Sequence, residues 1–154
     1  MSALPLIVDC QNNLTTMSKQ ANIEAQTKFG EAVNTGNLEV MNDLVASDAI
    51  ENDPAPGQAK GPQGYIDFFT KLRAAFPDLK LEVEQLVADD DNIAFAYTMT
   101  GTHKGDFNGI PATGKSVKAR GLQISRFEDG KMVERWGSSD ELGILKQIGV
   151  EIKA

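Results

Sequence analysis

The sequence predicts a single α+β domain, a cone of helices packed on a strongly curved antiparallel sheet that encloses an apolar pocket. Apolar residues recur at helical spacing over residues 18–75 and alternate with a period of two over residues 79–138. Helices and strands are therefore segregated along the chain, as in α+β domains. The length of 154 residues suits one domain with a full core. A bent sheet with helices on its concave side leaves a cavity between the layers.

The first helix is predicted to begin at Ser18. Residues 1–17 are expected to form an N-terminal arm, and residues 18–154 the domain. The expected core face of the first helix carries Ala25, Phe29, Ala32 and Val33. These four residues recur at intervals of three and four, which places them on one side of a helix.

Two further helices are predicted before the strands begin. A short one covers residues 38–45, with Asn37 as its N-cap, and a short extended piece and a Pro/Gly loop follow it. The next opens at Pro62 and is stopped by Pro77. Its aromatic stripe consists of Tyr65, Phe68, Phe69 and Leu72. Such a stripe is typical of a helix face that packs on the core.

Alternating residues predict two strands joined by the turn at residues 89–92. The first of these strands alternates apolar and charged residues from Leu79 to Glu84. The second places Ile93, Phe95, Tyr97, Met99, Gly101 and His103 on one face. Small residues occupy its other face, and whether the face that carries Tyr97 lies at the cavity stays open.

The last two strands are predicted to form a hairpin around Asp129-Gly130. In the strand before it, the alternation slips at Gly121, which predicts a bulge and a bend. The last strand covers residues 131–138, and a final helix ends at Gly149 as its C-cap.

Composition excludes several classes of function. The net charge of −7 makes nucleic acid an unfavourable partner. Cys10 and His103 are the only cysteine and histidine, so an internal disulfide and zinc sites of Cys/His clusters are excluded. No apolar run is long enough to span a membrane, and the start lacks the features of a signal peptide. We therefore expect a cytoplasmic location and no metal.

Residues 109–116, GIPATGKS, match the P-loop pattern of nucleotide-binding proteins. A functional P-loop connects a parallel strand to a helix whose N-terminus receives phosphate. Here the following residues, VKARGLQISRF, are typical of a strand, and nothing indicates βαβ alternation. We therefore expect a loop between strands and no nucleotide binding.

Three stretches together indicate a family. They are GTHKGDFNGIPATGK (101–115), RFEDGKMVERW (126–136) and DELGILKQIG (140–149). They resemble the SnoaL-like polyketide cyclase or ester cyclase family of the NTF2-like superfamily, and the resemblance extends from about residue 23 to residue 149. It implies a cone with an apolar cavity open at one end. It also implies intramolecular aldol closure of a polyketide ester without cofactor, with an aspartate as acid/base, and a homodimer through the convex sheet face.

Asp140, Glu134 and His103 are the candidate catalytic residues. Asp140 lies four residues after Trp136, where relatives also tend to carry aspartate, but it also precedes a helix and fits a capping role. Glu134 is a general base if its strand face is inward, or a solvated ion-pair partner if it is outward. His103 either orients a carboxylate or holds the 104–115 loop. Many relatives carry an acidic residue where this chain has Gly137.

Five residues are candidates for contacting a substrate: Trp136, Tyr97, Asn52, Gln123 and Ser138. Trp136 and Ser138 share a strand face with Glu134. The family resemblance implies that Asn52 points into the cavity. The alternative is that Asn52 forms a turn before Pro54.

The function that follows is cofactor-free acid/base proton transfer on a small hydrophobic carbonyl compound such as a polyketide ester. A carboxylate in an apolar cavity suits this chemistry, because desolvation raises its pKa toward the working pH. The alternatives are a non-catalytic NTF2-like protein that binds a small molecule, and a scaffold whose cavity is filled by side chains.

Overall fold

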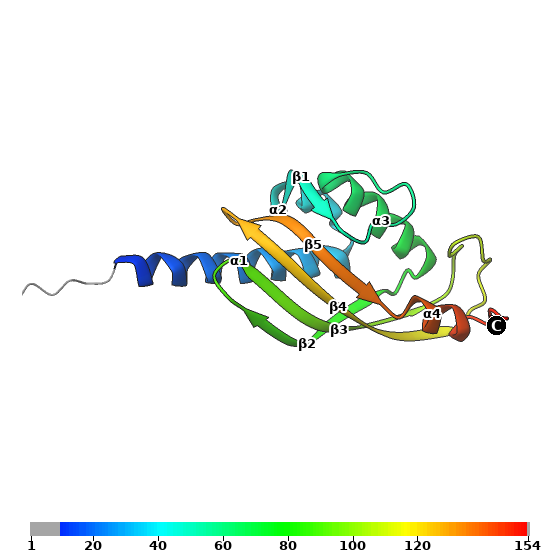
Figure 1. Cartoon of the computed structure of the whole chain (residues 1–154). Helices are drawn as coiled ribbons and strands as arrows, with labels where there is room; N and C mark the ends of the chain where they lie inside the picture. Colours follow the sequence, from blue (N-terminus) through cyan, green and yellow to red (C-terminus); the bar gives the residue numbers. More distant parts are fainter. Residues whose placement is uncertain (1–9, 154) are drawn as a thin grey trace, which may run out of the picture.

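The fold is described by a computed structural model that covers residues 10–153 (Figure 1). Its helices are α1 (Cys10–Thr35), α2 (Met41–Leu44), α3 (Gly61–Ala75) and α4 (Glu141–Gln147), with a 3₁₀ turn η1 (Leu38–Val40) before α2. Its strands are β1 (Val45–Glu51), β2 (Lys80–Ala88), β3 (Asn92–Thr102), β4 (Ser116–Glu128) and β5 (Lys131–Ser139). The predicted α+β class is confirmed. The first helix starts at Cys10 rather than Ser18, and residues 1–9 of the predicted arm lie outside the described residues.

The five strands form one sheet in the order β1-β5-β4-β3-β2. The pairs β2–β3, β3–β4 and β4–β5 are antiparallel, as predicted, whereas β1 pairs parallel to β5. The register of this parallel pair sets Ile50 beside Glu134 and Glu51 beside Arg135. Helices α1 and α3 lie on the same side of the sheet, and α1 extends beyond its edge at the N-terminal end (Figure 1).

Aromatic side chains join α1 and α3. Phe29 of α1 meets Tyr65 and Phe69 of α3 edge-to-face, with ring centroids 5.7 and 5.8 Å apart. Such pairs add about 0.5–1.5 kcal/mol to the stabilisation from burial. The predicted aromatic stripe thus faces the core through Tyr65 and Phe69, while Phe68 is 39% exposed.

The predicted bulge at Gly121 is wrong. Pairing of β4 with β3 continues without interruption through Gly121, and pairing with β5 begins at Gly121 without a shift. The residues of β4 that face inward are Val117, Ala119, Gly121, Gln123, Ser125 and Phe127. The apparent slip arises because Leu122 and Ile124 are apolar but face outward, where they are 63% and 47% exposed. The register shifts of the antiparallel pairs lie elsewhere, between Val83 and Gln85 and between Arg126 and Phe127, and the parallel β1–β5 pair has one between Val45 and Ile50.

The predicted hairpin and the end of the last helix are confirmed. Asp129 and Gly130 both have positive φ, at 50° and 74°, as a two-residue turn between twisted strands requires. Gly149 follows the C-cap of α4 with φ of 101°. Asn37 lies at the N-cap of η1, but its side chain makes no capping bond.

We expect Gly61→Ala to destabilise the fold more than Gly57→Ala. Both glycines have positive φ, at 66° and 75°, so alanine costs about 1–2 kcal/mol at either position. At Gly61 the added Cβ also collides with the backbone oxygen of Ser47, whereas nothing lies within 4 Å of a Cβ at Gly57. The collision adds about 1–3 kcal/mol. Urea unfolding of the two variants measures the difference, and equal values contradict the account.

Candidate active site

A cavity of about 1320 Å³ lies between the inward face of the sheet and helices α1 and α3. Its walls are largely aromatic and aliphatic and include Phe29, Tyr65, Phe69, Phe95, Tyr97 and Met99. This volume exceeds the ~300–1,000 Å³ of common ligand pockets, so a molecule with several fused rings fits.

One buried ion pair lies at the wall of the cavity, whereas the other charged residues that line it, such as Glu31, Asp53 and Arg120, are exposed. Nη1 of Arg135, on β5, donates to Oε2 of Glu51, the last residue of β1, over 2.8 Å. The hydroxyl of Tyr65, on α3, donates to the same oxygen over 3.0 Å. The side chains of Glu51 and Arg135 are only 9% and 18% exposed. The parallel β1–β5 pairing therefore brings a desolvated carboxylate to the cavity wall beside one cation and one phenol.

Gly137 makes the position of Arg135 possible. A Cβ at residue 137 would lie 2.6 Å from Nη2 of Arg135, so the guanidinium occupies the space that any larger residue would fill. Arg135 uses this space to reach Glu51, so the buried carboxylate at the cavity wall comes from β1.

Tyr65 and Tyr97, the two tyrosines of the chain, both line the cavity. Burial raises the pKa of Tyr65 well above its usual range, the negative charge of Glu51 raises it further, and Arg135 opposes the shift. Burial also raises the pKa of Tyr97, against the effect of Arg135. Both phenols therefore stay protonated through the neutral range.

We expect the native protein to show almost no tyrosinate absorbance at 295 nm as pH rises to about 10, the usual tyrosine pKa. Because both pKa values are raised on folding, the protonated tyrosines stabilise the fold fully below about pH 10, and this contribution is lost above it. The denatured chain should titrate normally. Half-ionisation of both tyrosines near pH 10 in the folded protein would contradict the buried placement.

Asp140 does not line the cavity. It is the exposed N-cap of α4, and its Oδ1 accepts from the backbone N–H of Gly143 over 2.8 Å. This is the capping role that the sequence left open.

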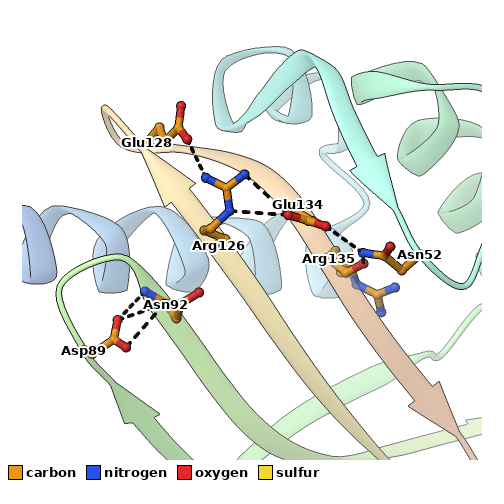
Figure 2. A network of polar contacts seen from close by, with 7 residues as sticks. All are labelled: Asn52, Asp89, Asn92, Arg126, Glu128, Glu134 and Arg135. Carbon is orange, nitrogen blue, oxygen red and sulfur yellow. Dashed lines mark hydrogen bonds and ion pairs between the residues drawn. The ribbon is translucent and has the colours of Figure 1, made fainter.

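Glu134, Trp136 and Asn52 also lie outside the cavity lining. Figure 2 shows Glu134 between Arg126 and Asn52. Its Oε2 is 3.4 Å from Nε of Arg126, and its Oε1 accepts from Nδ2 of Asn52 over 3.2 Å. Trp136 is 39% exposed and pairs with Ile124 across the outer face. Ser138 contributes to the lining but is itself exposed.

His103 is fully buried but is not part of the cavity lining. Its ring packs against Phe76 with centroids 5.6 Å apart, and its Nδ1 lies 3.0 Å from Oγ1 of Thr113. Its backbone N–H donates to the carbonyl of Lys115, and its carbonyl accepts from Gly114. These contacts hold the 104–115 loop against the end of β3.

Tyr97 and Gln123 are the predicted contact residues that face the cavity from the sheet. Gln123 is buried, and its Nε2 donates to Oγ of Ser125 over 2.8 Å. Within residues 10–153 we find no group of three His, Cys, Asp or Glu side chains placed to hold a metal ion. No helix in this part of the chain is long and apolar enough to span a membrane.

Residues 23–148 match the sequence model of the family described as SnoaL-like polyketide cyclase. The chain belongs to this family.

Two relatives are aklanonic acid methyl ester cyclases, DauD of Streptomyces sp. (strain C5) and DnrD of Streptomyces peucetius. Each is 25% identical over 134 residues, which is 82% of this SnoaL-like chain and 81% and 90% of the respective relative. The solved structure of IdmH from Streptomyces antibioticus is similar with a TM-score of 0.74 and 32% identity, over 84% of this chain and 99% of IdmH. TsrD of Streptomyces laurentii gives a TM-score of 0.77 at 25% identity, over 84% and 96%.

Glu51 and Arg135 are not among the site residues predicted from the sequence, and Tyr65 is predicted only as a core residue of this SnoaL-like domain. Glu51 and Arg135 are 84 positions apart, and the parallel pairing that joins them leaves no periodic signal. One local signal was available. Arg135 alternates with Glu134 and Trp136, so an outward Trp136 implies an inward arginine.

Proposed function

We propose that this SnoaL-like protein is a cofactor-free enzyme that transfers protons on a hydrophobic carbonyl compound such as a polyketide ester. Glu51 is the proposed acid/base, in place of Asp140 or Glu134. The observation that carries the proposal is the carboxylate of Glu51 at the wall of the large cavity, held by Arg135 and Tyr65. A fixed, desolvated carboxylate among apolar walls is suited to general acid/base catalysis.

The proposed reaction is an intramolecular aldol closure. Glu51 removes a proton from the carbon next to a carbonyl, and the resulting carbanion attacks a second carbonyl carbon of the same molecule. A C–C bond forms, the C=O π bond becomes an alkoxide, and the proton returns to that oxygen. The product is an isomer of the substrate, so no co-reactant is needed. The names of DauD and DnrD support a polyketide methyl ester as the substrate.

The test is incubation of the purified protein with a polyketide methyl ester that carries an enolisable dicarbonyl unit. We expect a ring-closed product of unchanged mass, identified by chromatography with mass spectrometry and by NMR, at a rate well above that of buffer. A substrate that binds but returns unchanged would contradict the enzymatic function.

Binding of the ester without conversion would favour a non-catalytic binding protein, and one observation supports this alternative. Both oxygens of Glu51 already accept hydrogen bonds from the protein, because Oε1 accepts from the backbone N–H of Asp53 over 3.2 Å. A base must give up one of these bonds when it takes a proton.

We also propose a homodimer through the outer face of the sheet. Val87, Ala94, Ile124 and Trp136 lie in register across four neighbouring strands. Three of them are large and exposed, with exposed fractions of 58% for Val87, 47% for Ile124 and 39% for Trp136. A continuous exposed apolar row of this kind marks an interaction surface.

Ile124→Glu should convert the dimer to a monomer in analytical ultracentrifugation. The emission of Trp136, the only tryptophan, should shift to the red as the face becomes exposed. Leu142→Glu places the same charge at a 50% exposed position on α4 and should leave the dimer intact. A wild-type protein that sediments as a monomer at all concentrations would contradict the proposal.

A further inference from the structure

We propose that the hydroxyl of Tyr97 is a hydrogen-bond donor that binds a carbonyl oxygen of the ligand in the cavity. This inference rests on the proposed function only in requiring a carbonyl ligand. It holds whether or not the ligand is converted. It assigns to Tyr97 one defined contact, to the oxygen, while Glu51 acts on the neighbouring carbon.

The two cavity tyrosines differ in how their hydroxyl groups are used. Tyr65 donates to Glu51 over 3.0 Å. Tyr97 faces the same cavity from β3, but no hydrogen bond from residues 10–153 reaches its hydroxyl. Tyrosine hydroxyls in apolar surroundings normally find a partner. The free O–H of Tyr97 is therefore available for an acceptor inside the cavity.

Gly121 keeps the space in which this hydroxyl lies. Tyr97 pairs with Gly121 across β3 and β4, and a Cβ at residue 121 would collide with the ring and the hydroxyl of Tyr97. Gly121 does not have positive φ, so its backbone conformation does not call for glycine. The glycine is needed for the space, and that space places the end of the phenol at the cavity wall.

Arg135 adds a positive charge at the same end of the cavity. Its charge acts on both Tyr97 and Tyr65, and its Nη1 donates to Glu51. A carbonyl oxygen hydrogen-bonded to Tyr97 lies within this field. When Glu51 removes the neighbouring proton, negative charge develops on that oxygen, where a fixed donor and a nearby cation stabilise it.

The experiment uses two probes of similar shape, 2-acetylnaphthalene and 2-isopropenylnaphthalene, of which only the ketone carries an acceptor. We expect Tyr97→Phe to weaken binding of the ketone about fivefold, as loss of one hydrogen bond does, and to change binding of the hydrocarbon less than twofold. Titration calorimetry measures both affinities. The carbonyl stretching frequency of the bound ketone should be lower in the wild type than in Tyr97→Phe.

Tyr65→Phe is the matched control, because it removes a hydroxyl of the same cavity that is already used by Glu51. It should leave the carbonyl frequency of the bound ketone at its wild-type value. An unshifted frequency in the wild type, an equal loss in Tyr65→Phe, or no binding of either probe overturns the inference. Because these are equilibrium measurements, absence of turnover with the predicted binding pattern would overturn only the enzymatic proposal.

Discussion

Glu51→Gln is expected to lower turnover of a cyclisable ester by about 10²–10⁴-fold, the usual contribution of a positioned acid/base. Glutamine keeps the size of the side chain and an oxygen that accepts from Tyr65, but it cannot take up the proton. The loss should lie in kcat, while the affinity for an unreactive ligand changes little. Turnover is measured per folded molecule, since the substitution leaves the charge of Arg135 unpaired.

Two carboxylates of this chain provide matched controls for that result. Glu134 makes an ion pair with an arginine as Glu51 does, but on the outer face. Asp140 caps α4 outside the cavity lining. Glu134→Gln and Asp140→Asn should each retain turnover within a few fold of the wild type. A large loss in either variant, with Glu51→Gln still active, would return the acid/base role to the residues that the sequence indicated.

Arg135→Met is expected to lower the free energy of unfolding by about 2–4 kcal/mol. Removing one partner of a buried ion pair leaves an uncompensated charge, which is a large penalty. The carboxylate that remains, Glu51, is only 9% exposed. Chemical denaturation followed by circular dichroism measures the change.

The double variant Glu51→Gln/Arg135→Met should recover much of this stability, because no unpaired charge remains. Arg126→Met tests the same substitution on the outer face, where the arginine side chain is 36% exposed, and should cost less than about 1 kcal/mol. Equal effects of Arg135→Met and Arg126→Met would show that the cavity ion pair is screened like a surface pair.

The features predicted well from the sequence are those with a local cause. The grouping of Phe95, Tyr97 and Met99 on one face of β3 follows from the alternation of large and small side chains, and the structure places this face at the cavity. The hairpin at Asp129-Gly130 follows from the backbone preferences of two neighbouring residues. Neither inference requires knowledge of a distant partner.

The predictions that were wrong or missing concern the outer face of the sheet and the pairing of strands that are far apart in the sequence. Leu122 and Ile124 are apolar on the outer face, so β4 shows apolar residues on both sides and its phase was misassigned at Gly121. The position of Glu51 at the cavity could not be predicted, because it depends on the parallel pairing of β1 with β5, and these strands are far apart in the sequence. Capping by Asp140 and holding of the 104–115 loop by His103 were the predicted alternatives to catalysis. The structure shows the contacts that both of these roles require.

The most direct test of the account is solvent deuterium exchange in a 1,3-dicarbonyl ester that can enolise but cannot close a ring. This probe isolates proton removal from the later C–C bond formation. We expect the wild-type protein to accelerate exchange at the carbon between the two carbonyls, as followed by NMR, and Glu51→Gln to abolish this acceleration while still binding the ester. Exchange that persists unchanged in Glu51→Gln would contradict the assignment of Glu51 as the acid/base.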